Sequence, residues 1–155
     1  MNRRSYEDDL NQFAAAPVPD DLVYIAIDIN GLKAVNDKYG HDAGDKLIVG
    51  AARCIEKCFG DKGKVYRIGG DEYAAILTSV QEERDTLLNA FEESLRAWSE
   101  SNGIQLTASF GCVFASELPG EGITSLAKAA DAKMYENKAL YYQTNGHDRR
   151  SYRRN

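Results

Sequence analysis

Apolar residues are spaced along the chain in two ways that predict its secondary structure. Compact apolar runs predict strands, and apolar residues three or four positions apart predict helices. We expect strands at residues 23–27, 64–68, 73–77 and 105–115. We expect helices at residues 2–14, 32–38, 42–59, 81–100 and 123–142.

Particular residues are expected to end or begin these elements. Pro17 and Pro19 end the first helix, and Asp42 is expected to cap the third. Gly69–Glu72 is a turn signal that predicts a hairpin between the second and third strands. Gly111 is expected to break the last strand.

The order helix, strand, two helices, hairpin, helix, strand, helix predicts the fold class. It indicates an α/β domain, an α+β sandwich in which helices cover the faces of a mostly antiparallel central sheet. We find no repeat and no low-complexity segment, and expect one domain over residues 1–155. Residues 1–20 would form an N-terminal helix and linker, and residues 143–155 a C-terminal tail.

Composition excludes several classes of protein. A net charge of −5 disfavours nucleic-acid binding, and the basic run 149–154 is best explained as a solvated tail. No apolar run is long enough to span a membrane and no signal peptide is recognisable, so we expect a cytoplasmic protein without membrane contact. Three cysteines disfavour a disulfide framework, and Cys54 and Cys58 are expected to be small buried residues rather than metal ligands.

Three carboxylates are candidates for chemistry. Asp28 directly follows an apolar strand, and strand ends are where α/β folds place reactive groups. If the hairpin carrying Asp71 and Glu72 pairs beside that strand, the three carboxylates converge and repel one another unless a cation lies among them. Carboxylate oxygens suit Mg²⁺. The alternative is a solvated Asp-Glu turn, which is common on protein surfaces.

A second group of residues suits an anion or a base. The backbone N–H groups of Gly31 and Leu32 begin a helix and could bind phosphate, with Lys33 adding a charge. The side chains of Asn36 and Asp45 could match the hydrogen-bonding edge of guanine. Turn formation and helix capping are the commoner explanations of such residues.

Two stretches together carry a family resemblance. Residues 28–45 read DINGLKAVNDKYGHDAGD and residues 67–73 read RIGGDEY. They resemble the two signature blocks of the GGDEF family; residues 130–138 resemble its third block and residues 2–6 the end of a fourth. The resemblance covers nearly the whole chain. It implies a fold similar to nucleotidyl cyclase and polymerase palm domains, and the condensation of two GTP molecules into cyclic di-GMP with release of two pyrophosphates.

The resemblance also implies roles for individual residues. Asp28 and Glu72 resemble ligands of Mg²⁺ (or Mn²⁺), assisted by the Ile29 carbonyl. Asp71 resembles the acid that serves a second metal or activates the attacking 3′-hydroxyl, and Lys33 joins Asp71 and Glu72 in catalysis. The substrate-binding residues implied are Gly31, Leu32, Lys33 and Lys138 for phosphate, Asn36 and Asp45 for guanine, and Gly69 and Gly70, which let the hairpin pass close to the nucleotide.

The family binds one GTP per domain, so the resemblance implies a symmetric homodimer as the active form. It also implies that this chain is a fragment of a longer protein, in which a sensory domain would lie upstream. The chain departs from the family pattern at Asn30, Leu32, Tyr73 and Tyr142, the last standing where many members carry a phosphate-binding Arg. The segment Gly60–Gly63 lacks the Arg-x-x-Asp motif of product inhibition.

Two alternatives stay open beside the diguanylate cyclase. One is a degenerate domain that binds GTP or a protein partner without turnover. The other is a cyclase that makes a different cyclic dinucleotide, against which Asp45 argues, because a carboxylate accepts from guanine N–H groups that adenine does not offer there.

Overall fold

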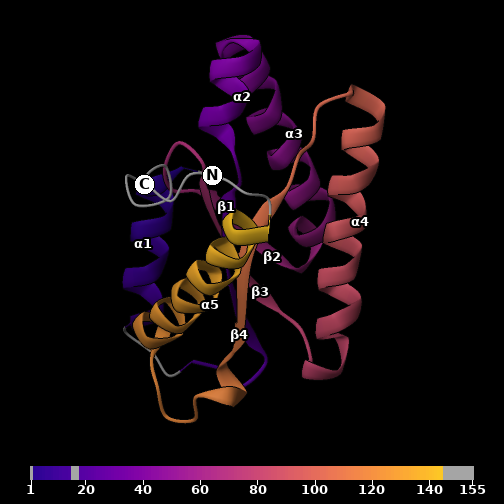
Figure 1. The fold of residues 1–155 in the computed structure, drawn as a ribbon. Coiled ribbons are helices and arrows are strands. Elements are labelled where there is room, and N and C mark those ends of the chain that lie inside the picture. Colours follow the sequence, from indigo (N-terminus) through magenta and orange to yellow (C-terminus); the bar gives the residue numbers. More distant parts are fainter. Residues whose placement is uncertain (1, 15–17, 145–155) are drawn as a thin grey trace.

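The computed structural model describes residues 2–14 and 18–144 (Figure 1). All the predicted helices and strands are present. In chain order they are α1 (Arg3–Ala14), β1 (Leu22–Ile29), α2 (Leu32–Tyr39), α3 (His41–Phe59), β2 (Gly63–Arg67), β3 (Glu72–Thr78), α4 (Arg84–Asn102), β4 (Ala108–Phe114) and α5 (Ile123–Thr144). Short 3-10 turns at Gly60–Lys62, Gln81–Glu83 and Ala115–Glu117 adjoin these elements.

The strands form one antiparallel sheet in the order β2-β3-β1-β4. β1 is buried along its whole length because it lies inside the sheet and is covered on both faces. Its side chains alternate between the two faces, as strand geometry requires. The antiparallel sheet with helices on its faces confirms the predicted fold class.

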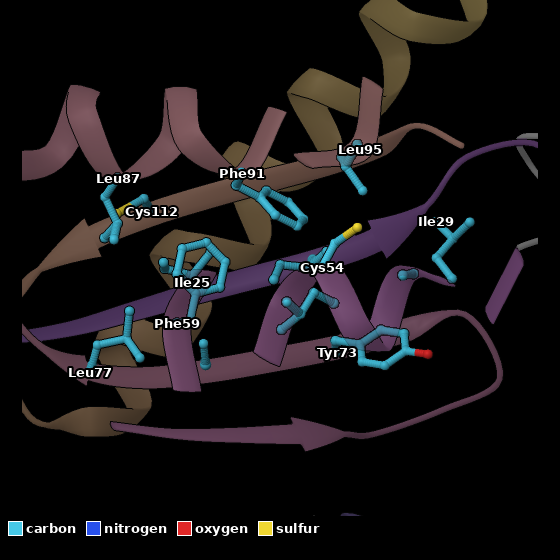
Figure 2. Packing of buried hydrophobic residues seen from close by; sticks show 14 of the residues in the cluster. Ile25, Ile29, Cys54, Phe59, Tyr73, Leu77, Leu87, Phe91, Leu95 and Cys112 are labelled. Atoms are coloured by element: carbon cyan, nitrogen blue, oxygen red, sulfur yellow. The ribbon is translucent and has the colours of Figure 1, made fainter. Parts of the chain in front are cut away.

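Two hydrophobic cores lie on opposite faces of the sheet. One packs β1 residues such as Ile25 against Phe59 of α3 and Phe91 of α4, whose rings lie 5.2 Å apart (Figure 2). The other packs Tyr24 of β1 against α1 and against Met134 of α5. The sheet therefore has α3 and α4 on one side and α1 and α5 on the other.

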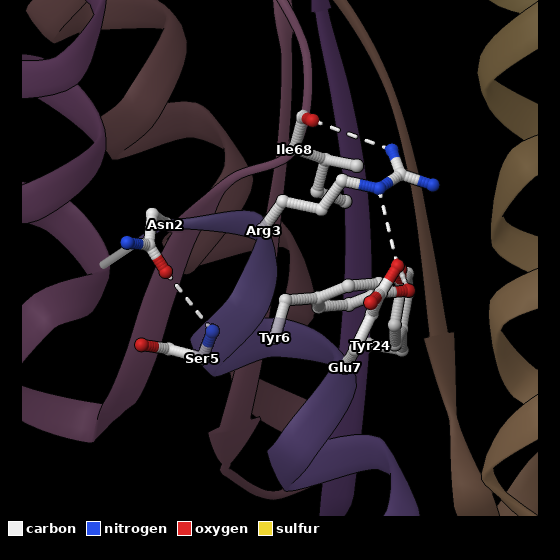
Figure 3. A network of polar contacts seen from close by, with 7 residues as sticks. All are labelled: Asn2, Arg3, Ser5, Tyr6, Glu7, Tyr24 and Ile68. Atoms are coloured by element: carbon white, nitrogen blue, oxygen red, sulfur yellow. Dashed lines mark hydrogen bonds and ion pairs between the residues drawn. The ribbon is translucent and has the colours of Figure 1, made fainter.

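Helix α1 is attached to the sheet by polar contacts (Figure 3). The hydroxyls of Tyr6 and Tyr24 lie 2.6 Å apart, and the Arg3 guanidinium donates to the Ile68 carbonyl at 3.4 Å. Ile68 directly precedes the Gly69–Glu72 turn. Helix α1 thus contacts the hairpin that carries the candidate carboxylates.

Two local predictions were wrong. Asp42 lies in the first turn of α3, but the residue before the helix is Gly40, with φ 92° and no side-chain cap. Strand β4 runs through Gly111, which pairs with Ala26. A Cβ at position 111 would lie 2.1 Å from the Ala130 carbonyl oxygen, so this glycine allows α5 to approach β4 closely.

The remaining expectations from composition can also be compared with the structure. Cys54 is buried and Cys58 half-buried, in agreement with a packing role for the first and only partly for the second. The expected roles of residues 15–17 and 145–155, including Pro17 and the basic run, lie outside the described residues. None of the described helices combines the length and apolarity needed to cross a bilayer.

Candidate functional site

Strands β1 and β3 bring the three predicted carboxylates together. Asp28, near the end of β1, lies opposite Glu72, the first residue of β3. The Ile29 backbone N–H donates to the Asp71 carbonyl at 2.9 Å, which holds the turn against β1. Carboxylate oxygens of Asp28, Asp71 and Glu72 lie within 4.8 Å of one another.

Asp28 is paired with a lysine from a distant helix. Lys138 of α5 donates to Asp28 Oδ2 at 2.9 Å, and the two side chains are only 1% and 4% exposed. The other oxygen, Asp28 Oδ1, is buried and has no hydrogen-bond partner among the described residues. One oxygen of this carboxylate is therefore paired with a lysine, and the other has no hydrogen-bond donor among the described residues.

The electrostatics of the pair reflect its burial. Burial raises the pKa of Asp28 to about 7; the Lys138 hydrogen bond opposes this effect and the charge of Asp71 adds to it. Burial is the largest influence on the pKa of Lys138 and acts to lower it, but the hydrogen bond to Asp28 and the nearby negative charges together raise that pKa above its usual value. Lys138 therefore remains protonated. The raised pKa of Asp28 means that the hydrogen bond from Lys138 does not fully offset the burial of the carboxylate.

The donor set fits a hard divalent cation. Mg²⁺ binds through one or two carboxylates together with substrate oxygens, and Mn²⁺ accepts the same ligands. Asp28 Oδ1, Asp71 and Glu72 supply such oxygens at the edge of the sheet, where Glu72 is exposed and Asp71 half-buried. These three residues could hold the ion, with the backbone of Ile29 beside them.

Arg67, the last residue of β2, stabilises the turn between β2 and β3. The Arg67 guanidinium donates to the carbonyls of Gly69 and Gly70 at 3.2 and 2.9 Å. Neither glycine has a positive φ, and a Cβ at either would meet no described atom closer than 3.7 Å. Neighbouring protein atoms therefore do not require glycine at these two positions. A reason for glycine must lie on the side of the turn that faces away from the protein.

A cavity of about 490 Å³ adjoins Asp71, a volume typical of small-molecule sites. Its lining is Ile29, Gly31, Leu32, Lys33, Ala34, Asn36, Asp37, His41, Gly70, Asp71 and Tyr142. Most of the predicted site residues are thus gathered around one space. Asp28, Glu72 and Lys138 lie in the adjoining carboxylate cluster, whereas Asp45 is exposed on α3 and does not line this cavity.

The start of α2 carries the predicted anion site. Gly31 has φ 67°, a left-handed conformation that favours glycine, and its N–H donates to the Tyr142 hydroxyl at 3.3 Å. A tyrosine oxygen is therefore the acceptor where a phosphate oxygen was expected. Lys33 is exposed at the cavity wall and Leu32 is half-buried.

Sequence reasoning assigned no role to Ala34, Asp37 and His41, which also line the cavity. A signal for Asp37 was available, because Lys33, Asn36 and Asp37 lie at positions i, i+3 and i+4 of a predicted helix and share one face. The place of His41 beside the cavity depends on the sharp corner between α2 and α3. The spacing of residues along the chain did not reveal this corner.

Comparisons with known proteins agree with this geometry. The family model described as "Diguanylate cyclase, GGDEF domain" matches residues 1–142. Diguanylate cyclase VdcA of Vibrio cholerae is 32% identical over 149 residues, which are 90% of this chain and 42% of that protein. The probable diguanylate cyclase DgcI of Escherichia coli is 31% identical over 140 residues, 89% of this chain and 29% of that protein. The chain thus spans less than half the length of these relatives.

The fold is shared with a solved domain. The GGDEF domain of TpbB, also called YfiN, from Pseudomonas aeruginosa matches with a TM-score of 0.75 and 27% identity, over 90% of this chain and 84% of that chain. The match of the family model, the relatives and the shared fold confirm the resemblance found in the sequence. The chain belongs to the GGDEF domain family of diguanylate cyclases.

Proposed function

We propose that this chain condenses two GTP molecules into cyclic di-GMP and releases two pyrophosphates. The observation that carries the proposal is the carboxylate cluster around Asp28, whose buried Oδ1 is unpaired beside a nucleotide-sized cavity. A buried carboxylate oxygen without a donor is costly unless a ligand satisfies it. A divalent cation with the phosphates of a nucleotide is the ligand that this donor set fits best.

In this proposal the acidic residues hold the metal and the attacking group. Asp28, Asp71, Glu72 and the Ile29 carbonyl would bind Mg²⁺ or Mn²⁺. When bound, the ion polarises the α-phosphate and lowers the pKa of the 3′-hydroxyl. Asp71, at the rim of the cavity, would accept the proton from that hydroxyl, while Lys138 keeps Asp28 oriented through its hydrogen bond.

The cavity would bind the rest of GTP. The backbone N–H groups of Gly31 and Leu32, together with the Lys33 ammonium, would bind the phosphates. Lys138, buried against Asp28, would add positive charge to the site without lining the cavity. Gly69 and Gly70 present no side chain, so the hairpin can approach the nucleotide. Asn36 would read the guanine, assisted by Asp45 from α3.

One domain would hold one GTP, so each product molecule requires two copies facing each other. The arrangement follows from stoichiometry, since each 3′-hydroxyl must attack the α-phosphate of the nucleotide in the other copy. A symmetric pair of identical sites is the simplest assembly that does so. In a longer protein, an upstream sensory domain would control this pairing.

A second candidate, a GTP-binding domain without turnover, is favoured by one observation. The Tyr142 hydroxyl already accepts the hydrogen bond of the Gly31 amide, which the enzyme would offer to phosphate. Nucleotide binding must displace or rearrange this contact. A domain in which this contact persisted could bind GTP with its α-phosphate in a position unsuited to attack by a 3′-hydroxyl.

Product formation separates the two candidates. The chain, alone at high concentration and fused to a dimerising segment, is incubated with GTP and Mg²⁺, and cyclic di-GMP is quantified by chromatography. Synthesis that disappears with EDTA supports the enzyme. If neither form makes product while calorimetry detects GTP binding, the GTP-binding domain without turnover replaces the enzyme as the proposed function.

A further inference from the structure

The corner between α2 and α3 brings two residues of the candidate base site into contact. Gly40 links the helices with φ 92°, and its N–H donates to the Asn36 carbonyl at 2.8 Å, ending α2. Helix α3 begins at the next residue, His41. This sharp turn places Asn36, in the last turns of α2, against Gly44, in the first turns of α3.

Gly44 is buried and has no side chain where Asn36 lies. A Cβ at position 44 would be 1.7 Å from Asn36 Oδ1 and 2.7 Å from Asn36 Cγ. The backbone itself does not require glycine, because Gly44 lies in a helix and is not among the residues with positive φ. Glycine in a helix is less stable than alanine. The reason for glycine at this position is therefore the neighbouring carboxamide.

The Asn36 side chain is held by packing rather than by hydrogen bonds at its oxygen. Asn36 Oδ1 is buried and has no hydrogen-bond partner among the described residues, and Asn36 lines the cavity beside Asp71. The amide oxygen is the Asn36 atom that lies nearest to the place of a Cβ on Gly44. Its orientation depends on the space above Gly44, since nothing else fixes the amide oxygen.

We propose that Gly44 is a positioning residue for base recognition: the missing side chain creates the space in which the Asn36 carboxamide lies in its base-reading orientation. The inference rests on the proposed function, in which Asn36 reads the base of GTP. It adds to Asn36 and Asp45 a residue of that site that never touches the ligand. The substrate class it serves is a purine nucleotide read through hydrogen bonds to its base edge.

The effect of Gly44→Ala should separate binding from stability. The atoms that must move form the end of a rotatable side chain, so the backbone can stay in place, and alanine favours the helix. We expect an unchanged or higher melting temperature. Affinity for GTP should fall by about tenfold, because the rotated carboxamide no longer pairs with the base. In the enzyme, KM should rise while kcat at saturation changes little.

A double-mutant cycle tests the mechanism. Gly44→Ala, Asn36→Ala and the double variant are compared by GTP calorimetry in Mg²⁺ and by thermal unfolding without nucleotide. If Gly44 acts through Asn36, Gly44→Ala weakens GTP binding in the wild-type background and has no further effect beside Asn36→Ala. Wild-type affinity in Gly44→Ala, or an equal loss in both backgrounds, overturns the inference.

The same cycle distinguishes failure of the inference from failure of the proposed function. If the wild-type chain does not bind GTP, the proposed function fails and the base-reading role of Gly44 fails with it. The packing is still measured: Gly44→Ala should raise the melting temperature more beside Asn36→Ala than in wild type, and an equal change would refute the contact. Gly50→Ala is the matched control, because its Cβ would lie 2.3 Å from the Trp98 ring; it should lower stability without changing GTP affinity of the folded protein.

Discussion

Lys138 of α5 donates a hydrogen bond of 2.9 Å to Asp28 of β1, and both side chains are almost completely buried. The lysine comes from the last helix and the aspartate from the first strand. The pair neutralises Asp28 Oδ2 and leaves Oδ1 without a partner among the described residues. Lys138 therefore joins the last helix to the first strand and fixes the orientation of this carboxylate.

Lys138→Met should destabilise the protein. Removing the lysine leaves the buried Asp28 charge uncompensated, which should lower the free energy of unfolding by about 3 kcal/mol. This value lies toward the lower end of such losses because Asp28 can take up a proton. Urea unfolding at neutral pH measures the change. Lys128→Met, at an exposed position of α5, is the matched control and should have little effect. Equal losses in the two variants would contradict a specific role for the buried pair.

Metal binding should depend on pH through Asp28. Its pKa is raised to about 7, and a cation binds only the carboxylate form. Below about pH 7, each unit of acidification should weaken Mg²⁺ or Mn²⁺ binding by up to about tenfold. Without metal the sign is opposite: the raised pKa adds stability that is complete below the unfolded value of 3.8 and is lost as the pH rises through about 7.

Thermal unfolding with and without Mg²⁺, on either side of neutral pH, measures this dependence. The ion should raise the melting temperature more on the alkaline side. Asp28→Asn should remove the stabilisation by the ion at every pH. A shift of the same size on both sides of neutrality would show that Asp28 does not control metal binding.

Asp71→Ala should abolish synthesis without unfolding the domain. The Asp71 backbone carbonyl, which accepts from Ile29 N–H, is retained, and its half-buried side chain supports no core. Removing a metal ligand or proton acceptor should lower kcat by about 10²-fold to 10⁴-fold. Asp61→Ala, an exposed acid on the 3-10 turn before β2, is the control and should retain activity. Full activity of Asp71→Ala would refute the assigned site.

Tyr142→Phe should strengthen GTP binding. The substitution removes the oxygen that accepts from the Gly31 N–H at 3.3 Å, so that this donor is available to phosphate. A part-buried hydrogen bond of ordinary strength corresponds to an increase in affinity of about fivefold. Calorimetry with GTP measures it, and guanosine without phosphates is the control ligand. Weaker GTP binding would mean that the hydroxyl contacts the nucleotide instead of competing with it.

Product inhibition through an Arg-x-x-Asp motif should be absent, and the fold opposes its restoration. A Cβ at Gly63, where the motif would have Asp, lies 2.1 Å from the Ile76 carbonyl oxygen and 2.8 Å from Leu77 Cα. Gly63→Asp should therefore lower the melting temperature through a backbone clash, and Gly60→Arg with Gly63→Asp should not create inhibition by cyclic di-GMP. Tight product binding by the double variant, measured by calorimetry, would contradict this reading.

Much of the architecture was predictable because it depends on neighbours along the chain. The apolar run before Asp28 predicts β1, and the helical spacing of Leu87, Phe91 and Leu95 predicts α4, since strand and helix periodicity are local properties. The carboxylate cluster was also anticipated, on the condition that the hairpin pairs beside β1; the observed register then places Glu72 opposite Asp28. The wrong predictions concerned Asp42 and Gly111, whose surroundings are set by the α2–α3 corner and by α5.

Tertiary structure alone decided how the site is completed. The bond between Lys138 and Asp28, the contact of Tyr142 with Gly31 and the space between Gly44 and Asn36 depend on where two helices lie on the sheet. A helix placed slightly differently would keep its hydrophobic pattern and lose each of these contacts, because hydrogen bonds require distances near 3 Å whereas burial tolerates larger shifts. The sequence by itself determined which residues could form the site, and the packing of α5 and α3 determined which atoms are paired and which are left for a ligand.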